Sequence, residues 1–191
     1  MANVLAINSS PRHNGNTAQM LDTVLEVCKK AGHDTELYQA GGLTVRGCMA
    51  CGRCFEAHPG RCVTDDWMND LYGKMKNADA ILMGSPTYFS DLTPELKAII
   101  DRCGYLAKSE KNSLSRKIGA AVSAVRRAGS IHTIDSIGHF FLISDMIMVG
   151  SSYWNMSIAR DKGDYEKDEE GIATMTGLGE NIAWLLNKIL D

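Results

Sequence analysis

The chain has 191 residues, which one hydrophobic core can accommodate, and its 45% hydrophobic and 23% charged residues are typical of a soluble globular protein. A formal net charge of −3 argues against a nucleic acid or an anionic membrane surface as the main partner. The first residues lack the pattern of a signal peptide, and no stretch approaches the ~18 apolar residues of a membrane span. We therefore expect a single cytoplasmic domain over residues 1–191.

Strand-like and helix-like patterns alternate along the chain. The strand patterns cover residues 3–8, 33–40, 78–85, 117–124 and 145–150. Helical spacing is found over 16–30, 65–76 and 131–143, and further helices begin near residues 93 and 168. Apolar strands that alternate with helices indicate a parallel sheet covered on both faces. We predict an α/β fold, a flavodoxin-like doubly wound sheet with strand order 2-1-3-4-5, followed along the chain by a polar loop at 151–167.

The loop after the first strand offers hydroxyl and amide side chains and the cation Arg12. It contains neither the G-x-G-x-x-G fingerprint nor a P-loop motif. Such side chains, together with the backbone N–H groups at a helix N-terminus, are suitable ligands for a phosphate group. A simple turn with a helix cap would use the same residue types. The candidate ligands are Ser9, Arg12, Asn14, Asn16 and Thr17.

Two further loops follow the third and fourth strands, and they would meet the first loop at the carboxyl ends of a parallel sheet. The first of the two provides an aromatic wall and backbone polar groups, which a flavin ring needs, and the second brings two arginines near the end of the ring. The aromatic residues could equally serve an interface or local packing, and arginines on a loop are often simply solvated. The candidate residues are Pro86, Thr87, Tyr88, Phe89, Arg126, Arg127 and Gly129.

Four of the six cysteines lie in the polar segment 47–66, at Cys48, Cys51, Cys54 and Cys62. The C-x2-C-x2-C spacing brings three sulfurs to one side of a tight loop, and the fourth can complete a four-thiolate site. This set suits a 4Fe–4S cluster or a structural zinc, and the steps of three favour iron–sulfur; free thiols are the remaining alternative. His58 could join the same site, whereas Cys28 and Cys103 are isolated and typical of buried small hydrophobes. Because the segment follows the second strand, we expect it at the same surface as the flavin loops.

With these loops in place, the sequence resembles the flavodoxin-like NADPH-dependent FMN reductases, and more closely their iron–sulfur flavoprotein branch. The resemblance covers nearly the whole chain and rests on NSSPRHNGNT, GCMACGRCFEAHPGRCVTDDW, GSPTYFSDLTPELKAIIDR and GSSYWNMSIARDKGDYEKDEEG. It implies an FMN phosphate at Ser9, Arg12, Asn16 and Thr17, a flavin ring at residues 86–89, and a 4Fe–4S cluster on the four cysteines. It also implies homodimers or tetramers that bring flavin and cluster together across subunits, with 151–167 as a candidate interface.

We therefore expect an FMN-dependent oxidoreductase that relays electrons between a cluster and FMN, with no side chain acting as nucleophile or general base. Its donor would be a ferredoxin or NAD(P)H, and its acceptor a small molecule such as oxygen, peroxide or a quinone. One alternative is a cluster-free NAD(P)H-dependent FMN or quinone reductase. The other is a non-catalytic module, either a flavodoxin-like shuttle or a metal-stabilised binding protein.

Overall fold

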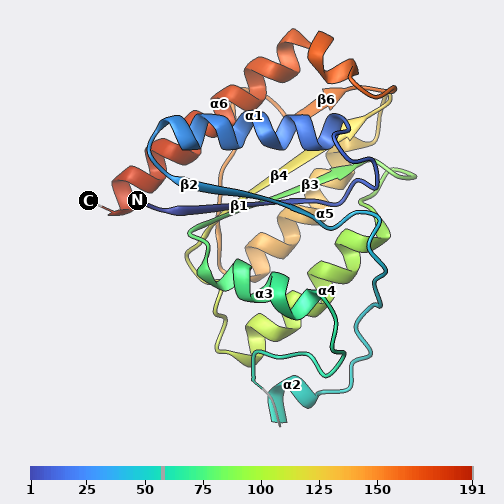
Figure 1. The fold of residues 1–191 in the computed structure, drawn as a ribbon, viewed down its shortest axis with the longest axis vertical. Helices are drawn as coiled ribbons and strands as arrows, with labels where there is room; N and C mark the ends of the chain where they lie inside the picture. The colour runs from blue at the N-terminus through green and yellow to red at the C-terminus, as the bar shows by residue number, and fades with distance from the viewer. Residues whose placement is uncertain (57–58, 191) are drawn as a thin grey trace.

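A computed structural model describes residues 1–56 and 59–190 of the chain (Figure 1). Its single sheet has the strand order β2-β1-β3-β4-β5, with β6 also paired to β4, and every pairing is parallel. The predicted fold class and strand order are thus confirmed. The strands are β1 (Asn3–Asn8), β2 (Asp34–Gln39), β3 (Ala80–Pro86), β4 (Ile118–Val125), β5 (Ile147–Met148) and β6 (Met156–Ile158).

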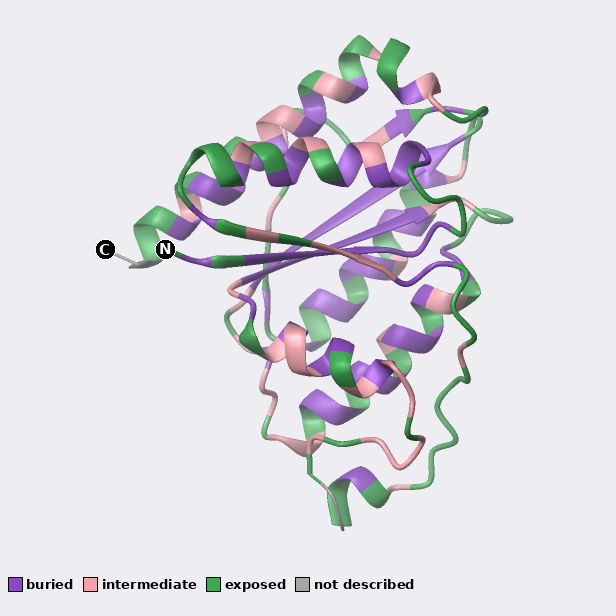
Figure 2. Cartoon of the chain, viewed as in Figure 1, coloured by how far each residue is buried: buried purple, intermediate pink, exposed green. Residues whose placement is uncertain are grey.

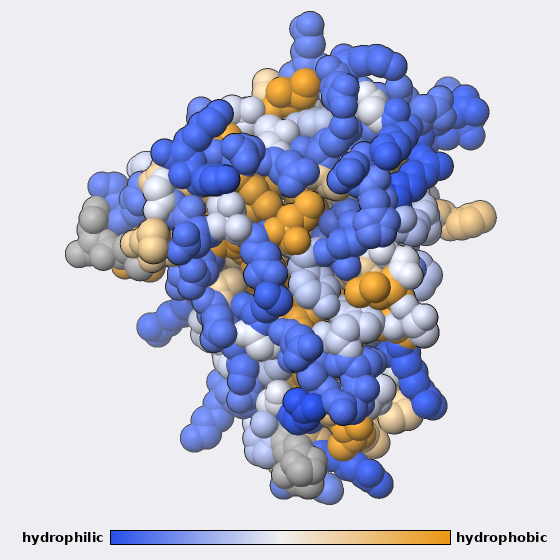
Figure 3. All heavy atoms as spheres, in the orientation of Figure 1, coloured by the Kyte–Doolittle hydropathy of each residue, from blue (hydrophilic) through white to orange (hydrophobic). Residues whose placement is uncertain are grey.

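Helices cover both faces of the sheet, with α1 and α6 on one side and α3, α4 and α5 on the other (Figure 1). Within residues 1–56 and 59–190, no helix combines the length and the apolar character that crossing a bilayer requires. The face drawn in Figure 3 is mostly hydrophilic. The helices are α1 (Asn16–Lys30), α2 (Arg53–Glu56), α3 (Met68–Asn77), α4 (Pro94–Ser109), α5 (Ser130–Ile143) and α6 (Glu169–Leu190), and a 3-10 helix, η1, spans Asp164–Lys167.

The central strands are buried on both faces, which explains why their sequences are continuously apolar (Figure 2). In β1, Leu5 and Ile7 pack into the core under α3, α4 and α5, whereas Val4 and Ala6 pack under α1 and α6. This alternation follows from the two-residue period of a strand. Two layers of helices therefore hold the sheet, and the loops at its carboxyl edge start from a rigid base.

The ends of two helices bear on function. Helix α4 begins where the sequence predicted: Thr93 caps it, since its side chain accepts a hydrogen bond of 3.3 Å from the N–H of Leu96, and Pro94 occupies the first turn. Helix α1 begins after Gly15, which has no side chain with which to cap the helix. The N–H groups of the first turn of α1 therefore face the carboxyl edge of the sheet without a side-chain cap.

Two predictions about the end of the sheet were wrong. The strand expected over 145–150 is only two residues long, and Ile147 and Met148 are 42% and 40% exposed instead of buried. In the structure this strand lies at an edge and pairs only with β4. The segment 151–167 is not a plain loop either, because it contains β6, which pairs with the end of β4, and η1.

Substitution of Gly41 tests how tightly the loop after β1 is packed. It lies just beyond β2, and a Cβ at this position would meet the carbonyl oxygen of Ser10 at 2.2 Å. Gly41→Ala is expected to lower the free energy of unfolding by about 1–3 kcal/mol, because the backbone must shift. Gly177→Ala in α6 is the control, since a Cβ there meets nothing within 4 Å. Denaturant titration of both variants checks this, and equal stability would contradict the close packing at Gly41.

Candidate functional site

One pocket lies at the carboxyl edge of the sheet, where the loops after β1, β3 and β4 meet the segment after β6 (Figure 1). We call it the carboxyl-edge pocket. It brings together many of the residues singled out from the sequence, including Arg12, Thr17, Thr87, Tyr88 and Arg126. The complete lining is Ser10, Arg12, Asn16, Thr17, Pro86, Thr87, Tyr88, Ala124, Arg126, Ala159 and Arg160.

One end of this pocket suits an anion. The first turn of α1 supplies backbone N–H groups and the positive end of the helix dipole. Arg12 and Arg160 line the same end, and Nη1 of Arg12 donates to the carbonyl oxygen of Arg160 at 3.4 Å. Two cations at a helix N-terminus are a suitable arrangement for a phosphate group, so the pocket fits the phosphate end of FMN.

Asn16 and Ser9 use their side chains within the protein. The amide of Asn16 donates to the carbonyl oxygen of Asp161 at 2.8 Å, and its oxygen accepts from the N–H groups of Gly163 and Tyr165. The hydroxyl of Ser9 donates to the carbonyl oxygen of Gly84 at 2.9 Å. These bonds tie the segment after β6 to α1 and the first loop to β3. The side chains of Asn16 and Ser9 therefore hold the loops around the pocket in place. The backbone N–H of Asn16, at the start of α1, is a separate group that can face an anion.

The aromatic wall of the carboxyl-edge pocket comes from Tyr88. Its N–H and C=O pair with those of Asp91, which closes a tight turn with Phe89 and Ser90 at the tip. Both tip residues have positive φ angles, 49° and 66°, and the side chain of Phe89 is fully exposed. Among the described residues, the pocket lining does not include Ser9, Asn14, Phe89, Arg127 or Gly129.

The sequence suggested that Gly129 lies near the end of the flavin ring, but in the structure it does not line the carboxyl-edge pocket. It precedes α5 with a φ of 95°, and a Cβ there would meet the Ser90 side chain at 2.8 Å. Gly129 thus lets the loop after β4 approach the turn after β3.

Arg160 lines the carboxyl-edge pocket but was not predicted as a site residue, because the sequence analysis did not predict strand β6. The signal was the short run Met156–Ile158, which places the residues after it at the carboxyl edge.

The four cysteines line a second pocket, which we call the cysteine pocket. After β2 the chain leaves the carboxyl edge and runs along the molecule to α2, at its lower end (Figure 1). There the four thiols face Arg102, Tyr105 and Leu106 of α4, and Phe55 of α2 packs edge-on against Tyr105 at 4.8 Å between ring centroids. Of the residues that the structure describes, none lines both pockets. The expectation that the cysteines share a surface with the flavin loops was therefore wrong for a single chain.

The thiols of the cysteine pocket are close enough to affect one another. Burial raises the pKa of Cys54, and the thiols of Cys51, Cys62 and Cys48 raise it further. Over residues 1–56 and 59–190, however, no three His, Cys, Asp or Glu side chains are already arranged around one metal position. The pocket thus contains the right donors for iron or zinc without a finished coordination shell. His58 lies outside the described residues.

The other two cysteines are buried thiols, as predicted. Burial raises the pKa of Cys28 to about 11 and that of Cys103 to about 12. Both residues are completely inaccessible to solvent and pack in the two cores, Cys28 from the inner face of α1 and Cys103 from that of α4. At neutral pH such thiols stay protonated, which makes them poor ligands and poor nucleophiles.

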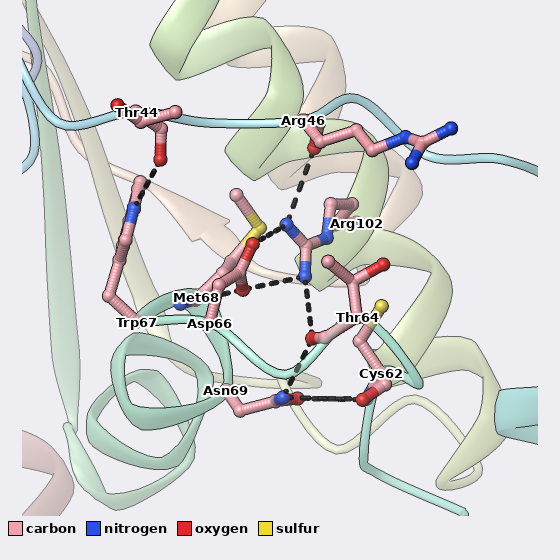
Figure 4. Close-up of polar contacts among 9 residues, drawn as sticks. All are labelled: Thr44, Arg46, Cys62, Thr64, Asp66, Trp67, Met68, Asn69 and Arg102. Atoms are coloured by element: carbon pink, nitrogen blue, oxygen red, sulfur yellow. Dashed lines mark hydrogen bonds and ion pairs between the residues drawn. The ribbon is translucent and has the colours of Figure 1, made fainter.

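The fourth cysteine is fixed through its backbone (Figure 4). The side chain of Asn69 accepts from the N–H of Cys62 at 2.8 Å and donates to the carbonyl oxygens of Cys62 and Thr64. Asp66 forms an ion pair with Arg102, and its interaction with Arg102 lowers the pKa of Asp66 although burial alone would raise it. Cys62, the cysteine most distant in sequence, is thereby held beside the other three.

A family model for NADPH-dependent FMN reductases matches residues 2–161 of the chain. The chain belongs to this family. An iron–sulfur flavoprotein of Methanocaldococcus jannaschii is 33% identical, covering 97% of this chain and 98% of that protein. An iron–sulfur flavoprotein of Methanosarcina thermophila is 32% identical over 97% and 96% of the two chains. Within the family, the chain groups with the iron–sulfur flavoproteins.

Solved structures show the same fold at low sequence identity. A WrbA-like flavodoxin from Agrobacterium tumefaciens superposes with a TM-score of 0.68 at 16% identity, covering 98% of this chain and 99% of that one. An NADH:FMN oxidoreductase in its apo form gives 0.69 at 16% identity, over 97% and 90%. With the family established, the chain is a flavin-dependent oxidoreductase that binds FMN. The carboxyl-edge pocket lies where ligands bind in this fold class.

Substitution of single arginines tests which residues contact the FMN phosphate. Arg12→Ala and Arg160→Ala should each raise the Kd for FMN about tenfold to hundredfold, since a hydrogen bond to a charged group contributes about 1.5–3 kcal/mol. Arg127→Ala should leave the Kd unchanged, because Arg127 is exposed and does not line the pocket. Fluorescence titration of the apoprotein measures all three. Loss of affinity only in Arg127→Ala would reject this assignment of the phosphate end.

Proposed function

We propose that this flavoprotein relays single electrons between a 4Fe–4S cluster in the cysteine pocket and FMN in the carboxyl-edge pocket. The observation that carries the proposal is that Cys48, Cys51, Cys54 and Cys62 line one pocket. Four thiolates are the standard ligand set of such a cluster. The names of the two archaeal relatives support the same reading, because both are called iron–sulfur flavoproteins.

The roles of the chain are binding and orientation. Bound FMN supplies the exchange between two-electron and one-electron chemistry, and a cluster supplies one-electron transfer. Arg12 and Arg160 would hold the phosphate, and Tyr88 would cover one face of the ring. Thr87 is held in place by hydrogen bonds to the hydroxyls of Ser123 and Thr133, and the N–H of Thr87 donates to the carbonyl oxygen of Ala124. The loop beside the ring is thereby kept rigid.

The separation of the two pockets points to a role for oligomerisation. Because the described lining residues of the two pockets do not overlap within one chain, we infer that a homodimer or tetramer brings the cysteine pocket of one copy to the FMN of another. The exposed rings of Tyr153 and Trp154, in the segment 151–167, are candidates for such a contact. The electron donor would be a ferredoxin or NAD(P)H, and the acceptor a small molecule.

A second function has two observations in its favour. The thiols of the described residues are not already arranged around a metal, so a cluster-free NAD(P)H-dependent FMN or quinone reductase is the alternative. A relative from Geotalea uraniireducens named NAD(P)H dehydrogenase (quinone) is 28% identical over 61% of this chain and 66% of that protein. In this alternative the same carboxyl-edge pocket binds FMN, and the cysteines are free or bind zinc.

Anaerobic purification followed by iron and acid-labile sulfide analysis distinguishes the two functions. We expect about four iron and four sulfide per chain, together with a flavin spectrum. Cys48→Ser and Cys62→Ser should lose most of the iron, since a cluster cannot form fully on three thiolates of this set. Cys28→Ser is the matched control and should keep the iron, because Cys28 is buried on the inner face of α1, away from the pocket.

The outcomes that contradict the proposal are equally distinct. A flavin spectrum without iron or sulfide in the wild type would favour the cluster-free reductase, and zinc in its place would make the cysteine pocket structural. Oxidation of reduced ferredoxin or of NAD(P)H with an added acceptor then identifies the donor. No turnover with either donor would leave a flavodoxin-like or metal-stabilised binding role.

A further inference from the structure

Arg102 is an unusual residue for its position in α4. Its neighbours on the inner face of the helix, Ile99, Cys103 and Leu106, are all buried and apolar or weakly polar. The side chain of Arg102 is itself only 2% exposed. Burying a guanidinium is unfavourable unless its charge and its N–H groups find partners. An arginine on this face therefore needs a specific set of acceptors.

Most of those acceptors lie at the two ends of residues 46–66, which carry the four cysteines and which we call the cysteine segment (Figure 4). The guanidinium pairs with both oxygens of Asp66, at 2.7 and 2.8 Å, in the two-pronged geometry that arginine favours. Nη1 also donates to the carbonyl oxygen of Arg46, and Nη2 to that of Thr64, each at 3.3 Å. Arg46 precedes the first cysteine of the pocket and Thr64 follows the last. One side chain on α4 thus holds both ends of the segment.

One donor of Arg102 is left over. Its Nε–H is buried and makes no well-formed hydrogen bond among the described residues, and the side chain of Cys62 lies close enough to act on the guanidinium. A buried N–H without an acceptor is unfavourable, so such a group in a binding pocket indicates a missing partner. Arg102 lines the cysteine pocket together with all four thiols. The acceptors that this pocket would offer when loaded are sulfur atoms.

We propose that Arg102 is a positioning residue of the cysteine pocket: its two Nη atoms anchor the cysteine segment, and its Nε donates to a sulfur of the bound cluster. The sulfur would belong to the Cys62 thiolate or to a sulfide. A cluster with four thiolates is negatively charged, so an adjacent cation and a hydrogen bond stabilise its reduced form and raise its reduction potential. This inference rests on the proposed function, and the two roles of Arg102 can be tested separately.

The anchoring role is tested on metal-free, FMN-loaded protein. Arg102→Lys keeps the charge but loses the two-pronged contact and the Nε–H. Cys48 and Cys51 are already exposed, so the readout is alkylation of the buried Cys54 and the half-buried Cys62. We expect their reaction with iodoacetamide, followed by mass spectrometry, to be at least tenfold faster in this variant. Arg46→Lys is the control, because its side chain extends away from the network and only its carbonyl oxygen takes part (Figure 4). Unchanged FMN affinity in both variants would show that the fold is intact.

The donor role is tested by anaerobic redox titration of the loaded protein, followed by electron paramagnetic resonance. Arg102→Lys should shift the cluster potential to a more negative value, while Arg46→Lys should leave it unchanged. Asp66→Asn provides a second variant that retains the guanidinium. Here alkylation of the metal-free protein should accelerate, but the cluster potential should not fall. A contact that only stabilised the fold would not produce this difference between the two variants.

Each result decides part of the proposal. Alkylation rates in Arg102→Lys equal to those of the wild type would overturn the anchoring role. An unchanged cluster potential in Arg102→Lys would overturn the donor role. Wild-type protein without iron would reject the proposed cluster and the donor role together, while the alkylation rates would still decide the anchoring role. Failure of the further inference is therefore distinguishable from failure of the proposed function.

Discussion

Every strand of the sheet runs in the same direction, and this constraint determines where the chemistry can take place. Parallel strands bring all the loops that follow them to one edge. The loops after β1, β3, β4 and β6 form the carboxyl-edge pocket for this reason, although residues 10 to 160 contribute to it. The N-terminus of α1 adds backbone N–H donors at the same place. The backbone alone therefore favours a phosphate group there, and the side chains of Arg12 and Arg160 add positive charge.

The cysteine segment follows β2 and yet departs from that edge, because its ends are fixed elsewhere. Arg102 and Asp66 hold the segment against α4, and Trp67 donates from its indole N–H to the carbonyl oxygen of Thr44 at 2.8 Å. The buried ion pair between Arg102 and Asp66 is one of these contacts. In the others, Arg102 and Trp67 donate to backbone carbonyl oxygens that lie before and after the cysteines in the sequence. The chain thus carries two pockets of different composition: the carboxyl-edge pocket, lined by arginines and Tyr88, and the cysteine pocket, lined by four thiols.

Much of the fold could be predicted from the sequence, since it depends on local patterns: apolar strands, helical spacing and the start of a helix near residue 93. Arg12, Thr17 and Tyr88 could be placed for the same reason, as they follow recognisable strands. Arg160 could not, because the three residues of β6 are too short to produce a clear pattern. The position of the cysteine pocket depends on contacts between residues far apart in sequence, such as Arg102 with Asp66, which no local pattern encodes.

In the proposed function, the cysteine pocket holds an iron–sulfur centre apart from the FMN. Anomalous X-ray diffraction at the iron edge, from crystals of the whole protein grown without oxygen, tests it most directly. We expect an iron peak enclosed by Cys48, Cys51, Cys54 and Cys62, next to Arg102, with FMN in the carboxyl-edge pocket of the same crystal. FMN in place with no iron peak at the cysteines would contradict it.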